Sequence, residues 1–326
     1  MRTIELGGAG PGASVIALGT STYGTAVPER LALELMDRYI EAGGNFLDTA
    51  HVYAAWLEGG EGASERTVGK WLASRGCRSA VIVATKGAHH DIGTYEKRLT
   101  EAAIRQDLHE SLDRLGVDSV DLYWLHRDDE AVPVGEVLGW LDEHVRSGLI
   151  GAIGCSNWSA DRQIDAARWA EQRGTIGFCA SQVRWSLAEF RLPPGDSGSG
   201  MLSMDEPMLA FHRRSGTAGV AYSAQANGFF SGKYGPDADE RAPGYRPDVA
   251  ERYGTPANYR RLAAARRLAA ALGRSPNQIA LAWLLHHRFP VIALCGPRTV
   301  EQLSDSCAAA DVVLDADQIE QLTAGR

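Results

Sequence analysis

The chain has 326 residues, of which 44% are hydrophobic and 23% are charged, a composition typical of a globular protein with a large core. Its formal net charge is −8 and its basic residues are scattered, which argues against nucleic acid as a partner. No apolar run approaches the ~20 residues of a membrane helix, and residues 1–10 lack a basic segment followed by an apolar one. We therefore expect a soluble, cytoplasmic protein with no membrane partner.

Short apolar, β-branched segments alternate along the chain with longer segments of helical period. This alternation predicts repeated β–α units and a parallel sheet. Because eight such strands occur, we expect an α/β fold of the (β/α)8 TIM barrel type, formed by a single domain over residues 1–326. The predicted strands are 15–19, 45–48, 80–85, 119–125, 150–155, 178–181, 219–221 and 291–294.

The segments between the strands have the pattern of amphipathic helices. Leu108, Leu112 and Leu115 lie on one stripe with charges opposite, as expected for a helix on the outside of a barrel. Gly116 and Gly148 follow such segments and predict C-terminal caps. The predicted helices are 29–42, 64–74, 100–115, 134–147, 160–172, 205–214, 259–272, 276–287, 299–309 and 315–322.

Two segments interrupt the alternation. Residues 190–204 are rich in Pro, Gly and Ser, and residues 232–257 repeat Gly, Pro, Asp and Arg. Both are predicted to be long loops at the C-terminal face of the sheet, where barrel enzymes have their active sites. Each is interpreted either as an active-site lid or as a surface insertion.

The five cysteines are widely spaced, odd in number and include no C-x-x-C pair. No other residue at metal-ligand spacing accompanies them. We therefore expect reduced thiols and no metal site.

Polar side chains stand at the ends of three predicted strands. Asp48 ends its strand, Lys86 and His126 directly follow theirs, and Tyr53 follows Asp48 by five residues. In a barrel these strand ends converge on one mouth. A buried lysine needs an acidic partner, which Asp48 can supply, and a lysine charge beside a phenol lowers the pKa of the tyrosine. The pattern predicts Tyr53 as a proton donor near neutral pH.

Each of these four residues has an ordinary structural interpretation when it is taken alone. Asp48 could cap a strand end, and Lys86 could be a surface charge. The histidine and the tyrosine could be core residues. The order of all four residues along the chain favours a catalytic site over these separate structural interpretations.

The four residues occur in the settings F-L-D-T-A-x-x-Y, A-T-K and Y-W-L-H, and there they resemble the catalytic tetrad of the aldo-keto reductase family. The resemblance implies an NAD(P)H-dependent oxidoreductase that reduces an aldehyde or ketone to an alcohol. By the same resemblance, hydride would come from the nicotinamide C4 and the proton from Tyr53, while His126 would orient the carbonyl oxygen. Further matching segments follow in order: 151–157, Ser181-Gln182, Tyr222-Ser223, 232–234 and 296–302.

The resemblance also implies cofactor contacts. Asn157 and Gln182 would hold the nicotinamide carboxamide, and the ring of Tyr222 would stack on the nicotinamide. Lys233 would supply a cation to the diphosphate, and Arg298 would grip the 2′-phosphate. NADP is therefore the expected cofactor, and NAD is a permitted one. The implied cofactor-binding residues are Gly19, Thr20, Ser156, Asn157, Gln182, Tyr222, Ser223, Gln225, Asn227, Ser231, Lys233, Gly296, Arg298, Gln302 and Ser306.

The sequence departs from the family pattern at three places. Gln225 follows the Tyr-Ser pair where a Pro-Leu pair is frequent, and Ser306 stands where an asparagine commonly holds the adenine. Residues 54–63 lengthen the loop after the tetrad tyrosine, so the resemblance does not name the substrate. Aromatic residues expected to line the substrate pocket are Tyr23, Trp56, Trp124, Trp158, Trp185 and Phe229.

Two other classes of function are kept as alternatives. The first is a cofactor-binding regulator with slow turnover, because the resemblance includes channel-associated subunits. The second is a metal-dependent hydrolase or isomerase, which would leave the lysine and tyrosine of the tetrad unexplained. Its metal ligands would come from His51, His89, His90 and His126. The sequence leaves the oligomeric state open.

Overall fold

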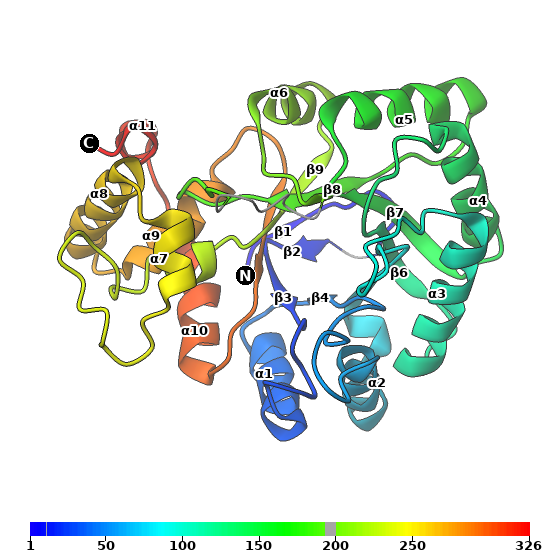
Figure 1. Ribbon diagram of the computed structural model, residues 1–326, viewed down its shortest axis with the longest axis horizontal. Helices are drawn as coiled ribbons and strands as arrows, with labels where there is room; N and C mark the ends of the chain where they lie inside the picture. The colour runs from blue at the N-terminus through cyan, green and yellow to red at the C-terminus, as the bar shows by residue number, and fades with distance from the viewer. Residues whose placement is uncertain (11, 193–199) are drawn as a thin grey trace.

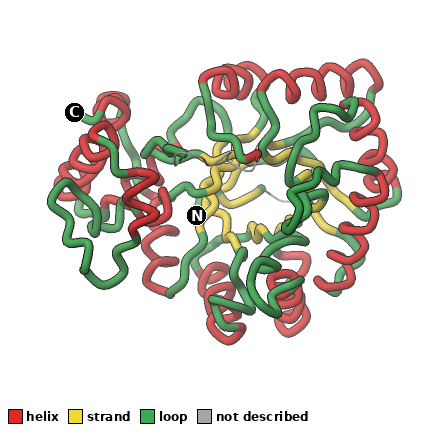
Figure 2. Tube along the Cα trace, viewed as in Figure 1, coloured by secondary structure: helices red, strands yellow, loops and turns green. Residues whose placement is uncertain are grey.

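The computed structural model describes residues 1–10, 12–192 and 200–326. Eight parallel strands close into a barrel in which each strand pairs with the next and the last pairs with the first (Figure 1). Helices surround the strands, as Figure 2 shows. The predicted (β/α)8 barrel is therefore confirmed. Its strands are β3 (Ile16–Gly19), β4 (Phe46–Asp48), β5 (Ile82–Gly87), β6 (Val120–Leu125), β7 (Ile150–Ser156), β8 (Ala180–Arg184), β9 (Ala218–Tyr222) and β10 (Val291–Cys295).

The outer helices bury one apolar side and end at capping residues. In α3 (Glu101–Leu115) the predicted stripe is buried, the Thr100 side chain accepts a hydrogen bond from the Ala103 N–H, and Gly116 ends the helix at φ 65°. The other helices are α1 (Glu29–Glu41), α2 (Ala63–Arg75), α4 (Val134–Arg146), α5 (Ala160–Arg173), α6 (Glu206–Ser215), α7 (Pro247–Tyr253), α8 (Pro256–Leu272), α9 (Pro276–Leu285), α10 (Val300–Ala308) and α11 (Ala316–Ala324).

Apolar side chains fill the inside of the barrel. Phe46, Ile82, Leu122 and Trp124 belong to this interior cluster. Gly154 on β7 makes room for the indole, because a Cβ atom at this position would lie 2.4 Å from the Trp124 ring. Trp124 is fully buried, so its prediction as a wall of the substrate pocket is corrected: it is barrel core.

A short hairpin precedes the barrel. Strands β1 (Thr3–Ile4) and β2 (Ala13–Ser14) pair antiparallel, and Leu6 and Ala9 between them join the interior cluster. Gly8 lies close to the start of β7, since a Cβ atom on it would be 3.5 Å from the Gly151 carbonyl oxygen. The hairpin thus closes the barrel at the end where the strands begin, which leaves the opposite end as the mouth.

The two predicted long loops have different outcomes. In the segment 190–204, residues 193–199 lie outside the described residues. The segment 232–257 contains α7, which the sequence analysis did not predict, and Val249 and Tyr253 of this helix are buried in an aromatic cluster. Helix α8 begins at Pro256, three residues earlier than predicted. Among the described residues, no helix combines the length and apolar character needed to cross a membrane.

Candidate active site

The four tetrad residues meet at the mouth of the barrel. Asp48 ends β4, Lys86 lies near the end of β5, and His126 directly follows β6. The Lys86 ammonium is fully buried and donates hydrogen bonds to the Asp48 carboxylate, to the Tyr53 hydroxyl at 2.9 Å and to the Thr49 carbonyl oxygen at 2.8 Å. The lysine therefore joins the carboxylate and the phenol in one cluster.

Asp48 is held by further donors. The Tyr53 hydroxyl lies 3.4 Å from Oδ2, and the Gln182 amide donates to Oδ1 at 3.1 Å. The Thr20 hydroxyl donates to the Asp48 carbonyl oxygen at 3.1 Å. Both carboxylate oxygens thus have partners, as a buried charge requires.

Burial and, after it, the Asp48 charge raise the pKa of Tyr53 well above its ordinary value of 10.0. The pKa of Tyr53 is therefore shifted upward, opposite to the lowering expected from the sequence, because burial and the Asp48 charge outweigh the opposing charge of Arg127. Burial also lowers the pKa of Lys86, while Asp48 opposes the change. Tyr53 consequently keeps its proton at neutral pH and can act as a donor.

The His126 ring lies beside the tyrosine. It meets the Tyr53 ring edge-on at a centroid distance of 5.8 Å and the His89 ring at 4.7 Å. Burial, followed by the charge of Arg127, lowers the pKa of His126 well below 6.5. The imidazole is therefore neutral, so only one of its nitrogens carries a proton, and Nδ1 has no partner among the described residues.

The residues expected at the carboxamide lie next to the tetrad. The Ser156 hydroxyl donates to the Gln182 carbonyl oxygen at 2.9 Å, and the Asn157 amide donates to Ser156 Oγ at 3.0 Å. Asn157 Oδ1 accepts from the Tyr222 hydroxyl at 2.8 Å and from the Leu202 N–H at 3.0 Å. The structure thus brings four of the predicted cofactor-binding residues together across β7, β8 and β9.

A second group forms between β9 and α10. The Gln225 amide donates to Asn277 Oδ1 at 3.1 Å and to Ser306 Oγ at 3.0 Å. Ser306 in turn donates to the Gln302 carbonyl oxygen at 2.8 Å, and the Arg298 N–H donates to Gln302 Oε1 at 2.8 Å. Four predicted residues meet here, together with Asn277, which the sequence analysis did not identify.

The backbone after β9 has an unusual conformation. Ser223, Ala226 and Asn227 have φ angles of 52°, 48° and 54°, the left-handed region that ordinary residues rarely adopt. A turn that combines left- and right-handed residues can direct backbone N–H groups toward an anion.

The remaining predicted cofactor residues are less closely grouped. Gly19 and Gly296 are neighbours, since a Cβ atom on Gly296 would lie 3.8 Å from the Gly19 carbonyl oxygen. Lys233 and Ser231 are exposed, and the Lys233 ammonium lies against Gly244. The described structure therefore does not bring Lys233 to the second group.

The aromatic residues predicted to line the substrate pocket mostly belong to the core. Trp56 alone of this set is exposed, at 50%, and its ring meets the Tyr53 ring edge-on at 6.3 Å. Trp158 packs against Phe178, and Trp185 packs against Trp283. The prediction is corrected for the residues that lie in the hydrophobic clusters, which are Tyr23, Trp158, Trp185 and Phe229.

Two buried arginines at the mouth escaped the sequence analysis. Arg127 directly follows His126, and Arg184 ends β8 two residues after Gln182. Their positions at strand ends are the signal that could have identified them.

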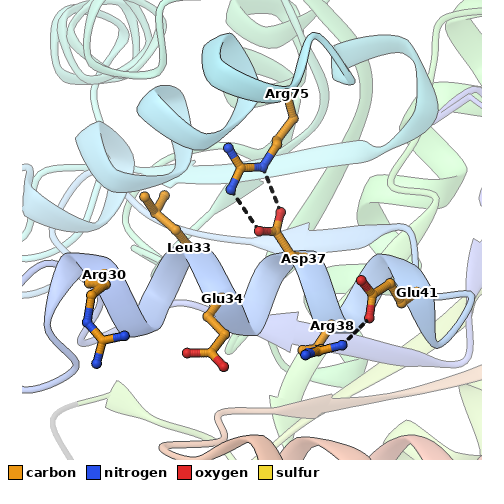
Figure 3. Close-up of a pocket in the computed structure, with 7 residues that line it drawn as sticks. All are labelled: Arg30, Leu33, Glu34, Asp37, Arg38, Glu41 and Arg75. Carbon is orange, nitrogen blue, oxygen red and sulfur yellow. Dashed lines mark hydrogen bonds and ion pairs between the residues drawn. The ribbon is translucent and has the colours of Figure 1, made fainter.

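Two hollows on the outside of the barrel lie away from the tetrad. The larger, of about 350 Å³, is lined by α1 and the end of α2 (Figure 3). In it Asp37 pairs with Arg75 at 2.8 Å, and Arg38 pairs with Glu41 at 2.8 Å. The second, of about 230 Å³, lies at α5 and α6. Neither contains a residue of the strand ends.

The metal-dependent alternative lacks a ligand group. Within residues 1–10, 12–192 and 200–326, no three His, Cys, Asp or Glu side chains are grouped so that they could hold a metal. His51 instead lies 2.7 Å from Glu110 Oε2. All five cysteines are free thiols.

The fold and the cluster at the strand ends define a barrel enzyme with its polar groups at the C-terminal face. The sequence matches the model described as Aldo/keto reductase family over residues 15–325, and the chain belongs to this family. It is therefore an oxidoreductase of a family that generally uses nicotinamide cofactors, and it acts on small molecules.

Three relatives illustrate the similarity. The chain is 30% identical to an uncharacterized oxidoreductase of Bacillus subtilis, YrpG, over 99% of this chain and 95% of that protein. It is 31% identical to an uncharacterized oxidoreductase of Mycobacterium tuberculosis, over 99% and 92% of the two chains. It is 29% identical to the norsolorinic acid reductase stcV of Emericella nidulans, over 96% and 78%. These names favour an enzyme over the regulatory alternative.

Proposed function

We propose that this protein reduces an aldehyde or ketone to an alcohol with NADPH, and that Tyr53 donates the proton. The observation that carries this proposal is the buried Lys86, which bonds both the Tyr53 hydroxyl and the Asp48 carboxylate at the mouth of the barrel. A buried ammonium costs free energy, so packing alone does not account for it. A lysine bonded to the phenol oxygen stabilises the negative charge that develops there as the proton leaves.

Each tetrad residue has a separate role in the proposal. Tyr53 is partly exposed and protonated at neutral pH, so it can reach and protonate a carbonyl oxygen. His126 is neutral and donates a hydrogen bond to the same oxygen. Asp48 holds Lys86 in place and takes no proton itself.

The residues around the tetrad fit a nicotinamide dinucleotide. When bound, the reduced nicotinamide supplies the hydride that attacks the carbonyl carbon. Asn157, Gln182 and Tyr222 would hold its ring and carboxamide, and the left-handed stretch from Ser223 to Asn227 would hold the diphosphate. Gln182 donates to the Asp48 carboxylate and the Tyr222 hydroxyl donates to Asn157, which supports a cofactor path that starts beside the tetrad.

We further propose that Arg298 selects NADPH over NADH. Arg298 is exposed and directly precedes Thr299, the N-cap of α10, so its side chain can face the cofactor. No ion pair in the described part of the chain includes it, and an arginine near a helix N-terminus is disfavoured by the helix dipole. A bidentate contact with the 2′-phosphate would give this charge a purpose.

The test is a screen of aldehydes and ketones in which the absorbance of NADPH is followed. Wild-type protein should oxidise NADPH steadily with at least one carbonyl. Tyr53→Phe keeps the ring but removes the proton donor, so it should lose most of the turnover, about 10²–10⁴-fold, while NADPH binding changes little. Equal turnover by the variant would refute the assignment of Tyr53.

A further inference from the structure

Arg127 and Arg184 are buried at the mouth without an acidic partner. Arg127 is 8% exposed and its Nη1 donates to the His126 carbonyl oxygen at 2.9 Å. Its Nε is buried and has no hydrogen-bond partner among the described residues. Arg184 is 6% exposed, lies 3.6 Å from the centroid of the Phe190 ring, and directs Nη2 toward the Met201 sulfur at 3.6 Å. No carboxylate in the described part of the chain pairs with either.

Both positive charges act on the residues of the site. After burial, the Arg127 charge is the largest cause that lowers the pKa of His126 and of His89. Burial raises the pKa of Tyr222, and Arg184 and Arg127 both oppose this rise. The Arg184 guanidinium lies 5.8 Å from the centroid of the Tyr222 ring, and Arg127 directly follows His126 in the chain.

Two buried guanidinium groups without a counter-ion are unfavourable. Arginine stays protonated in proteins, so neither group can avoid its charge by losing a proton. A buried charge is tolerated when an opposite charge joins it, and the planar guanidinium matches a carboxylate or phosphate with two parallel hydrogen bonds. The free Nε of Arg127 is the kind of donor that such an anion would use.

We propose that Arg127, supported by Arg184, binds an anionic oxygen group of the substrate. The substrates are then aldehydes or ketones that also carry a carboxylate or a phosphate, and Arg127 binds that group while Tyr53 and His126 hold the carbonyl oxygen. The identity of the substrate rests on the proposed carbonyl reduction. The anion site itself stands on the two arginines.

The kinetic test compares an acid with its ester. We expect Arg127→Gln to lower kcat/KM for p-formylbenzoate about 10- to 100-fold, the range of a lost hydrogen bond to a charged group, mainly through KM. For the methyl ester of the same aldehyde, the same variant should change kcat/KM less than about twofold. The ester has no carboxylate, so it makes no charged contact with Arg127 that the variant could remove. Arg127→Lys should recover part of the loss for the acid.

A second pair separates the two kinds of anion. The kcat/KM values for glyceraldehyde phosphate and for glyceraldehyde are compared in wild type and in Arg127→Gln. If Arg127→Gln lowers kcat/KM more for the phosphate than for p-formylbenzoate, phosphate is the preferred group, and if less, carboxylate is. Arg30→Gln on the outer face of α1 is the control for a general loss of positive charge. It should leave unchanged the ratio of kcat/KM for the anionic substrate to kcat/KM for the neutral one, in both pairs. An Arg127→Gln variant that slows acid, phosphate and neutral substrates equally would overturn the proposal, and so would one that weakens NADPH binding to the same extent.

Binding measurements keep this test independent of turnover. Calorimetry of p-formylbenzoate and its methyl ester with the NADP⁺-bound protein should show tighter binding of the acid in wild type, and this preference should disappear in Arg127→Gln. If wild-type protein reduced no carbonyl but still showed the preference, the proposed reaction would fail and the anion site would stand. Asp196 lies outside the described residues, so Asp196→Asn is combined with Arg127→Gln in a double-mutant cycle. If the melting-temperature shift of the double variant differed from the sum of the two single shifts, Asp196 would interact with Arg127. The chain itself would then supply the anion, which would overturn the proposal.

Discussion

Replacing Lys86 by methionine tests the buried pair directly. The Lys86 and Asp48 side chains are both 0% exposed, so the variant leaves a carboxylate charge in the core. Breaking such a pair costs about 3–5 kcal/mol. An unfolding entropy of roughly 2.1 cal/mol/K per residue gives about 0.7 kcal/mol/K for 326 residues. The melting temperature of Lys86→Met should therefore fall by about 4–7 °C.

Calorimetry at neutral pH measures this shift, and Lys70→Met provides the matched control. Lys70 pairs with Glu29 at 2.6 Å, but the two side chains are 60% and 46% exposed. An exposed pair is worth about 0.2–1 kcal/mol, so this control should shift by less than about 1.5 °C. Adding Asp48→Asn to Lys86→Met removes the stranded charge and should restore part of the stability. If Lys86→Met lowered the melting temperature no more than Lys70→Met, the reasoning about a buried ion pair would be refuted.

Three further predictions concern the cofactor, the pH and the long segment after β9. Arg298→Ala should raise KM for NADPH about 10- to 100-fold and leave KM for NADH nearly unchanged, and an equal rise for both cofactors would exclude the 2′-phosphate contact. Burial lowers the pKa of His89 to about 4, so the unfolded chain binds an extra proton at this residue between pH 6.5 and 4. His89 alone should therefore contribute about 2 kcal/mol to the loss of stability from pH 7 to pH 5. His89→Asn should lose less stability over this range in thermal melts, and parallel curves for the two proteins would contradict the prediction. In hydrogen exchange, NADPH should slow the amide exchange of residues 232–246. The amides of 247–253 should exchange slowly even without NADPH, because α7 has its own buried contacts. Unchanged exchange at 232–246 would argue for a fixed surface loop.

The sequence could predict that Asp48, Lys86 and His126 meet because strand ends in a barrel converge, and the resemblance to the aldo-keto reductase family added their interpretation, with Tyr53, as a tetrad. Three tetrad residues end or follow apolar, β-branched segments, which period and composition identify without tertiary information. The pKa of Tyr53 could not be predicted in the same way. Its direction depends on how far the surrounding groups remove water from the phenol and on how near the Asp48 charge lies, and no sequence pattern reports either quantity.

Other differences between the predicted and the observed structure also have local causes. Strands β1 and β2 have two residues each, too few to show an alternation. The helix at 247–253 was hidden by the Gly and Pro around it, although Pro247 at its first turn is itself a helix-start signal. Trp158 and Phe229 were placed at the mouth because they are aromatic and near strand ends. In loops that follow a strand, the period of two no longer tells which side a ring faces, and both rings pack into the core.

The hairpin of β1 and β2 makes the barrel open at one end only. At the open end Trp56 is half exposed and its ring meets the Tyr53 ring edge-on, so a molecule that binds at Tyr53 would lie beside Trp56. The first fifteen residues therefore cover the end of the barrel opposite to Tyr53, far from the groups at the mouth.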